Sequence, residues 1–230
     1  MRQNATKGSS KPLRVTVRSE RPSGPVELDG RLHLPERETG PGVVLCHPHP
    51  AGGGCMDVLL LRRIASELTS RGSAVLRFDF GGVGASGGTF TNGEEETVDV
   101  AAAFAFMADR KEGRAEEISV AGWSFGSWMC LKALADGLGA NACVSVAPPL
   151  DGCEWRPLAP RLTASPARRH YIVGDRDQFC SVRTLEEFTD AVPETGPEAV
   201  TVLENTDHFL FGLEDEVAAL VARFSLGTDP

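Results

Sequence analysis

The stretch of this sequence with the clearest chemical potential is Gly122-Trp123-Ser124-Phe125-Gly126. A short apolar run precedes it and a helical pattern follows it, which predicts a strand, a tight turn and a helix with the serine at the turn. Such a G-x-S-x-G turn exposes the serine hydroxyl and leaves the next backbone N–H free to bind an oxyanion. The glycines let the backbone pass close to neighbouring elements. A serine hydroxyl is a weak nucleophile, so the pattern predicts chemistry only if the chain also supplies a base and a carboxylate.

Candidates for both partners lie downstream, each after a predicted strand. Asp175 and Asp177 follow the strand at 171–173, and His208 follows the strand at 199–203. A histidine can accept the serine proton if a carboxylate fixes its tautomer and stabilises the imidazolium. The order Ser, Asp, His also distinguishes this set from the other two common serine-triad orders. The residues therefore favour nucleophilic acyl transfer through Ser124.

The elements that must position these side chains alternate between strands and amphipathic helices. Strands are predicted at 13–17, 25–34, 42–46, 73–80, 117–121, 142–147, 171–173 and 199–203, and helices fill most of the longer connections between them. This alternation predicts a doubly wound, mainly parallel α/β sheet with helices on both faces. Ligands of such sheets bind beyond the carboxyl ends of the strands, which is where the candidate side chains fall. In the second of these segments, Asp29-Gly30 is a strong turn signal, so we expect residues 13–34 to form antiparallel strands at one sheet edge with a turn at this dipeptide.

Composition sets limits on the function. The net charge of −9 and the lack of a Lys/Arg cluster argue against nucleic acid as a partner, and no apolar run is long enough for a membrane helix. The six cysteines are scattered without C-x-x-C spacing, so we expect neither a disulfide framework nor a metal site, and we expect no cofactor. The N-terminus is polar and has no apolar signal segment, which favours the cytoplasm. We predict a flexible tail at 1–12 and a single domain at 13–226.

Five motifs in order resemble those of a known family. They are C-H-P-H-P at 46–50, F-D-F-G-G-V-G-A-S-G-G at 78–88, the serine turn, G-D-R-D at 174–177 and D-H-F at 207–209. Over residues 13–225 the chain resembles the α/β-hydrolase superfamily, and within it the small lidless bacterial serine hydrolases with an H-P-H-P oxyanion loop. The resemblance implies a mostly parallel sheet of about eight strands with an antiparallel N-terminal edge. It also implies no or minimal lid, because the segment between the strands at 142–147 and 170–173 is short.

The same resemblance implies roles for individual residues. Ser124 would be the nucleophile, His208 the general base and Asp177, the aspartate of a G-x-x-D pattern, the acid. Asp175 remains an alternative acid because it lies two residues away, and so does Asp151, which follows the preceding strand where some relatives place their acid.

The oxyanion hole is expected to use two backbone amides. One is the N–H of Phe125, the residue after the nucleophile. The other belongs to the loop after Cys46, in which the two prolines have no N–H. His49, between those prolines, is the best candidate by position, and Ala51 is the second. We expect the histidines of this loop, His47 and His49, to position the backbone rather than act as general base.

The glycine-rich loop at 82–87 reads G-x-G-x-x-G, which is also a dinucleotide fingerprint. A nucleotide site would need the last glycine at a helix start, whereas the next helix is expected about ten residues later, so we predict no nucleotide here. Relatives often carry arginine in place of Gly81, so a local polar contact is expected to be missing.

The predicted enzyme is a carboxylic ester hydrolase, a serine esterase acting on a small acyl substrate. Two alternatives remain: a thioesterase or small-peptide hydrolase with the same triad, and a non-catalytic ligand-binding protein of the same fold. Trp123, Phe179 and Phe209 are candidates for the substrate pocket, as are Trp128 and Trp155, with a core position at least as plausible for Trp128. The sequence is compatible with a monomer or a homodimer.

Overall fold

The computed structural model describes residues 11–192 and 198–228; the predicted tail therefore lies almost wholly outside the described residues. The strands are β1 (Leu13–Arg21), β2 (Gly24–His33), β3 (Gly42–Cys46), β4 (Val75–Phe78), β5 (Ile118–Trp123), β6 (Ala142–Val146), β7 (Arg168–Gly174) and β8 (Glu198–Leu203). The helices are α1 (Leu59–Ser70), α2 (Glu96–Arg110), α3 (Phe125–Ala135), α4 (Ala159–Leu162), α5 (Val182–Ala191) and α6 (Glu214–Ser225), with short 3-10 turns at Pro50–Gly52, Ala115–Glu117 and Leu150–Gly152.

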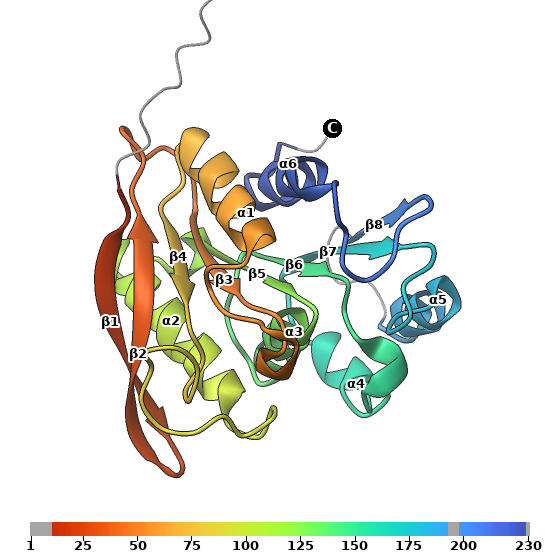
Figure 1. The fold of residues 1–230 in the computed structure, drawn as a ribbon, viewed down its shortest axis with the longest axis horizontal. Coiled ribbons are helices and arrows are strands. Elements are labelled where there is room, and N and C mark those ends of the chain that lie inside the picture. The colour runs from red at the N-terminus through yellow and green to blue at the C-terminus, as the bar shows by residue number, and fades with distance from the viewer. Residues whose placement is uncertain (1–10, 193–197, 229–230) are drawn as a thin grey trace, which may run out of the picture.

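All of these strands belong to one sheet, in the order β1-β2-β4-β3-β5-β6-β7-β8. From β4 to β8 the neighbours are parallel, whereas β1 pairs with β2 and β2 with β4 in antiparallel fashion (Figure 1). The structure confirms the predicted α/β-hydrolase fold with its antiparallel N-terminal edge. The connection from β6 to β7 holds only one 3-10 turn and the single-turn helix α4, so there is no inserted lid.

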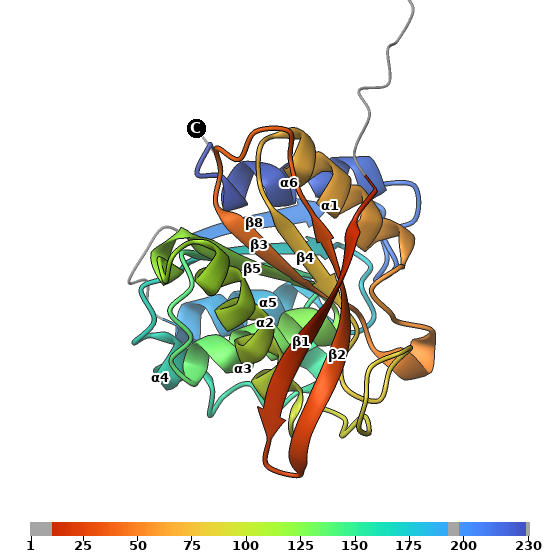
Figure 2. The ribbon, with the colours of Figure 1, turned by 90° about the vertical axis from the view of Figure 1, so that its left-hand side faces the viewer.

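The central strands are buried on both faces because helices cover both sides of the sheet. Val43 and Leu45 of β3 pack in one core with α1 and α6, and their neighbours Val44 and Cys46 pack in the other with α2 and α3. Figure 2 shows α1 and α6 on one side of the sheet and α2, α3 and α5 on the other. This alternation explains the continuous apolar runs in the sequence, since both faces of each strand require apolar side chains. No helix in the described part of the chain is long and apolar enough to cross a membrane.

The predicted turn at the antiparallel edge was wrong. Asp29 and Gly30 lie inside β2, opposite Thr16 and Val15, and the chain reverses between Arg21 and Gly24 instead. The Asp29 carboxylate is occupied by ion pairs with neighbouring arginines at 2.7 and 3.0 Å. A glycine fits at position 30 because a Cβ there would come within 3.0 Å of Val15 and 3.2 Å of Leu76. The dipeptide therefore serves packing and ion pairing within a strand.

Candidate functional site

The serine turn has the geometry that its sequence predicts. β5 ends at Trp123, α3 begins at Phe125, and Ser124 between them has φ 53° and ψ −118°. A side chain at φ > 0 costs about 1–3 kcal/mol, so the surrounding structure must enforce this conformation. The glycines are required sterically: a Cβ at Gly122 would lie 2.3 Å from the carbonyl carbon of Gly126, and a Cβ at Gly126 would lie 2.2 Å from a backbone oxygen of the β3 loop.

The side chains of Ser124, His208 and Asp177 form a hydrogen-bonded series. The Oγ of Ser124 lies 2.8 Å from Nε2 of His208, and Nδ1 of His208 lies 2.9 Å from both carboxylate oxygens of Asp177. A carboxylate can only accept, so Nδ1 carries the hydrogen and Nε2 is left to accept from the serine hydroxyl. All three residues are at least nine-tenths buried. Residues separated by up to 84 positions in the sequence thus meet at the carboxyl ends of β5, β7 and β8.

Asp177 is held in place by backbone amides as well as by the histidine. Its Oδ1 accepts hydrogen bonds from the N–H groups of Phe179 (2.8 Å) and Cys180 (3.1 Å). Among the hydrogen bonds of the described residues, Oδ2 contacts only Nδ1 of His208, which lies equally close to Oδ1. The two carboxylate oxygens therefore have different surroundings: Oδ1 also accepts backbone N–H groups, whereas Oδ2 is left to accept the hydrogen bond from His208.

The other two candidate acids have different partners. Asp175 is exposed and accepts the N–H of Thr206 at 3.0 Å, and backbone hydrogen bonds of this kind lower the pKa of its carboxyl group. Asp151 accepts the N–H of Ser181 at 2.7 Å and the hydroxyl of Thr184, at the start of α5. Among the hydrogen bonds of the described residues, neither aspartate contacts His208. Asp175 instead ties the loop that carries His208 to the end of β7.

His47 is a structural histidine of the loop after β3. It is fully buried, its Nδ1 donates to the Pro48 carbonyl oxygen at 2.7 Å, and its Nε2 accepts the N–H of Phe80 at 3.1 Å. Burial lowers the pKa of His47 to about 4, so the ring is neutral at pH 7. This pair of contacts joins the loop to the end of β4. His33 and His170 are likewise buried within strands.

His49 has a side chain that fixes its own loop and a backbone amide that is unoccupied. Its Nδ1 accepts the N–H of Ala51 at 3.1 Å, so Nε2 carries the hydrogen and donates to Oδ1 of Asn92 at 2.7 Å. The amide of Ala51, the second candidate for the oxyanion hole, is thereby engaged. Within residues 11–192 and 198–228, the amides of His49 and Phe125 have no recorded hydrogen-bond acceptor.

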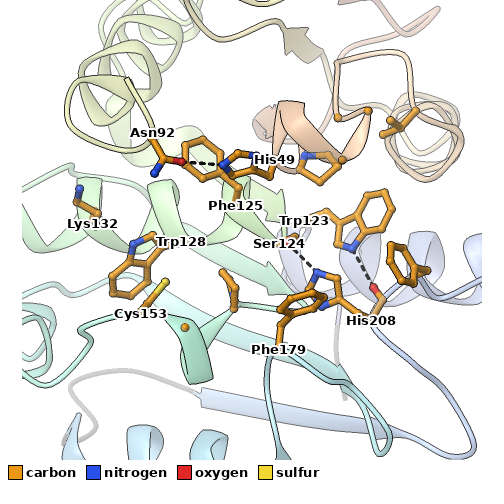
Figure 3. Close-up of a pocket in the computed structure, with 18 of the residues that line it drawn as sticks. His49, Asn92, Trp123, Ser124, Phe125, Trp128, Lys132, Cys153, Phe179 and His208 are labelled. Atoms are coloured by element: carbon orange, nitrogen blue, oxygen red, sulfur yellow. Dashed lines mark hydrogen bonds between the residues drawn. The ribbon is translucent and has the colours of Figure 1, made fainter. Parts of the chain in front are cut away.

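Ser124 opens onto a cavity of about 880 Å³. The predicted pocket residues Trp123, Phe179 and Phe209 all line this cavity. Trp128 lines it too, and Figure 3 shows Trp123, Phe179 and Trp128 around Ser124. The expectation for Trp155 was wrong: its ring is buried in the core against Phe188, with the ring centroids 5.5 Å apart. The cavity wall also includes His49, Asn92, Lys132, Cys153 and Glu154.

Two of these wall residues, Asn92 and Lys132, were missed at the sequence level. Asn92 follows the glycine loop and has a left-handed φ of 56°, and Lys132 lies on the α3 helix two turns after Ser124. A helical spacing of seven to eight residues from Ser124 was the signal that could have placed Lys132 on the same face as that serine. Nothing in the sequence indicated Asn92.

The polar contact expected to be missing at Gly81 is made by Arg21, the last residue of β1. The guanidinium of Arg21, at the end of β1, lies directly over Gly81: a Cβ there would approach the guanidinium carbon to 2.5 Å. Arg21 is buried and pairs with Asp99 and Glu96 of α2, and Asp99 also accepts the N–H of Gly81 at 2.9 Å. The glycine loop continues to Gly87, well before α2 begins at Glu96, so no glycine lies at that helix start.

Comparison with known proteins gives a consistent fold. No protein-family model matches the sequence. An uncharacterised protein from Rickettsia prowazekii is 26% identical over 188 residues, which are 79% of this chain and 77% of that protein. An α/β serine hydrolase homologue from Coxiella burnetii is 25% identical with a TM-score of 0.78, over 96% of this chain and 99% of its own.

Two more distant structures show the fold alone. A serine hydrolase without a lid from Xanthomonas campestris is 22% identical with a TM-score of 0.77, over 96% of each chain. An esterase from Pyrococcus furiosus is 20% identical with a TM-score of 0.74, over 93% of this chain and 92% of its own. The support for a hydrolase in general terms comes from the homologue of Coxiella burnetii.

Proposed function

We propose that this chain, a homologue of the α/β serine hydrolases, cleaves small carboxylic esters through a covalent acyl intermediate on Ser124. The observation that carries the proposal is the unbroken series from Ser124 Oγ through His208 to Asp177, with each step at 2.8 or 2.9 Å, at the floor of an open cavity. A serine hydroxyl in contact with the unprotonated nitrogen of an oriented imidazole is the arrangement that activates it for attack on a carbonyl.

In the first half of the reaction, Ser124 Oγ attacks the ester carbonyl carbon and its proton passes to Nε2 of His208. Asp177 stabilises the resulting imidazolium. The carbonyl oxygen becomes an oxyanion, for which the free amides of Phe125 and His49 are the proposed donors. One such donor contributes about 2.7–4 kcal/mol to transition-state stabilisation in enzymes of this type. The Nε2 proton then goes to the leaving alcohol oxygen, and the C–O bond of the ester breaks.

In the second half, water attacks the acyl carbon and gives its proton to Nε2 of His208. The tetrahedral intermediate collapses, the proton returns to Ser124 Oγ, and the carboxylic acid leaves. The connection between β6 and β7 holds only a 3-10 turn and the single-turn helix α4, and the lack of a larger insertion at this place supports a small, water-accessible acyl substrate.

The proposal is tested by covalent labelling and hydrolysis together. A fluorophosphonate reagent should modify one residue, Ser124, as located by peptide mass spectrometry, and heat-denatured protein should not react. Ser124→Ala should lose labelling and reduce kcat/KM for p-nitrophenyl butyrate by at least on the order of 10³-fold. Ser181→Ala, which removes an exposed hydroxyl at the start of α5, is the matched control and should behave like wild type.

Retained activity in Ser124→Ala would exclude the proposed mechanism. If labelling occurs but short p-nitrophenyl esters are not cleaved, the ester proposal fails, and parallel assays with acyl-CoA thioesters and small peptide amides identify the alternative substrate. The absence of both labelling and hydrolysis would instead indicate a ligand-binding protein of this fold.

A further inference from the structure

The cavity has two unlike ends. Figure 3 shows Trp123 and His208 on one side of Ser124, and Trp128, Cys153 and Lys132 on the other. The walls are mostly apolar and aromatic, but the second end contains an ammonium group. A cation facing an apolar cavity is costly unless something pairs with it.

The chemistry of the reaction assigns the two ends. This step rests on the proposed function: Nε2 of His208 must deliver its proton to the leaving oxygen, so the alcohol part of the ester lies on the His208 side. The oxyanion faces the amides of Phe125 and His49. The remaining substituent of the carbonyl carbon, the acyl chain, is then directed toward Trp128 and Lys132.

The ammonium group of Lys132 has more hydrogen-bond donors than acceptors assigned to it. Its Nζ donates to the carbonyl oxygen of Gly93, while an ammonium group has three donors. Among the described residues, the ion pairs of lysine side chains are those of Lys111, and none involves Lys132. Lys132 is eight residues beyond Ser124 on the α3 side, about 12 Å along the helix axis. Side chains on a helix lean toward its N-terminus, which directs the ammonium back toward the nucleophile.

Asn92 adds a second donor at the same end. The Nε2–H of His49 donates to Oδ1 of Asn92, which fixes the orientation of the Asn92 amide. The Nδ2 group of Asn92 can then donate its hydrogens to a ligand in the cavity. Asn92 lines the cavity and directly precedes Gly93, whose carbonyl oxygen holds Lys132. A carboxylate with two acceptor oxygens could therefore bind one ammonium and one amide donor.

We infer that the cavity selects esters whose acyl chain ends in a second carboxylate, that is, half-esters of dicarboxylic acids, with Lys132 as the specificity-determining residue and Asn92 as its partner. The chain as a whole carries a net charge of −9, so long-range attraction does not favour such a substrate and a local cation is needed. Glu154 also lines the cavity, but it is exposed and makes no ion pair with Lys132, so it leaves the ammonium uncompensated.

The test compares an anionic with a neutral ester of matched reactivity. The probes are mono-p-nitrophenyl suberate and p-nitrophenyl octanoate, assayed with wild type and with Lys132→Met and Lys132→Arg. Lys132→Met should lower kcat/KM for the suberate half-ester about ten- to hundredfold, mainly through KM, because a hydrogen bond to a charged group is lost. The octanoate value should change less than about threefold. Lys132→Arg should keep most of the preference, and 0.5 M salt should weaken it in wild type.

The outcomes separate this inference from the proposed function. If wild type cleaves octanoate in a Ser124-dependent way but shows no preference for the half-ester, the inference is wrong and the esterase proposal stands. Equal losses on both esters in Lys132→Met also overturn it, since they would show that Lys132 only anchors the loop at Gly93. Glu154→Gln, which removes the other charge of this end, should leave the half-ester rate the same or higher; a tenfold decrease would contradict the inference. If neither ester is cleaved, the proposed function itself fails.

Discussion

The most decisive single substitution is Asp177→Asn, because the structure dictates how the new amide must orient. Oδ1 of Asp177 accepts two backbone N–H groups, those of Phe179 and Cys180, so the asparagine oxygen must occupy that position. The NH₂ group then lies where Oδ2 was, against Nδ1 of His208. Nδ1 of His208 also lies 2.9 Å from Oδ1, but that oxygen already accepts two backbone N–H groups. Because two donors repel at hydrogen-bond distance, the tautomer that is favoured has its hydrogen on Nε2 and accepts from the new NH₂ group through Nδ1.

That tautomer removes the base. With a hydrogen on Nε2, His208 donates to Ser124 Oγ instead of accepting its proton, over the same 2.8 Å contact. In serine hydrolases the wrong tautomer lowers kcat by on the order of 10⁴-fold, which corresponds to about 5.5 kcal/mol of activation free energy. The substitution is isosteric and retains both backbone contacts, so we expect the midpoint of thermal unfolding to change by only a few degrees.

The assay is burst and steady-state hydrolysis of a p-nitrophenyl ester, with a fluorophosphonate labelling rate as a second readout. Asp175→Asn and Asp151→Asn are the matched controls, because each changes an aspartate that was a candidate acid but contacts other groups. Both should retain activity within about threefold of wild type. If Asp177→Asn keeps more than a tenth of wild-type kcat, or if a control variant shows the large loss instead, the assignment of the acid is wrong.

Two further predictions concern stability. Burial lowers the pKa of His47 to about 4 from an ordinary value of 6.5. Between these pH values the folded state therefore binds fewer protons than the unfolded chain. The contribution of the neutral His47 to the free energy of unfolding is complete above pH 6.5, and up to about 3 kcal/mol of it is lost as the pH falls to 4. Urea unfolding at pH 7, 5.5 and 4 should show a shallower decrease in His47→Gln. Arg21→Met leaves Asp99 buried without its cation and should cost about 3–5 kcal/mol in the same assay at pH 7. Adding Gly81→Arg, which supplies a guanidinium from the position where the family resemblance implies an arginine, should recover part of that loss.

Each of the two stability predictions would be contradicted by a specific result. An identical pH slope in wild type and His47→Gln would show that His47 does not titrate in this range. A cost below about 1 kcal/mol for Arg21→Met, or a double variant less stable than the single one, would show that Arg21 does not do what an arginine at position 81 would do.

The sequence by itself was enough to predict the fold and to nominate the reacting residues. Continuous apolar strands such as β3 require cover on both faces, and their alternation with amphipathic helices leads to a parallel sheet. Ser124 could be identified because the elbow has strict local requirements: glycines at 122 and 126 are forced by backbone approaches of 2.2 to 2.3 Å. Local chemistry of this kind is visible in a few consecutive residues.

Contacts between distant segments were decided only by the tertiary structure. Asp29-Gly30 has the composition of a turn, but pairing with β1 and β4 keeps it inside a strand. The arginine over Gly81 comes from Arg21, which no pattern in the glycine loop could indicate.

Which of the three aspartates contacts His208, and which loop amide already has an acceptor, were likewise decided by the tertiary structure. Each depended on which acceptors were already occupied by groups from other parts of the chain. Residue types and local spacing are properties of the chain, whereas hydrogen-bond occupancy is a property of the assembled fold. For that reason the candidate nucleophile, Ser124, could be predicted from the sequence, and Lys132 at the far end of the cavity could not.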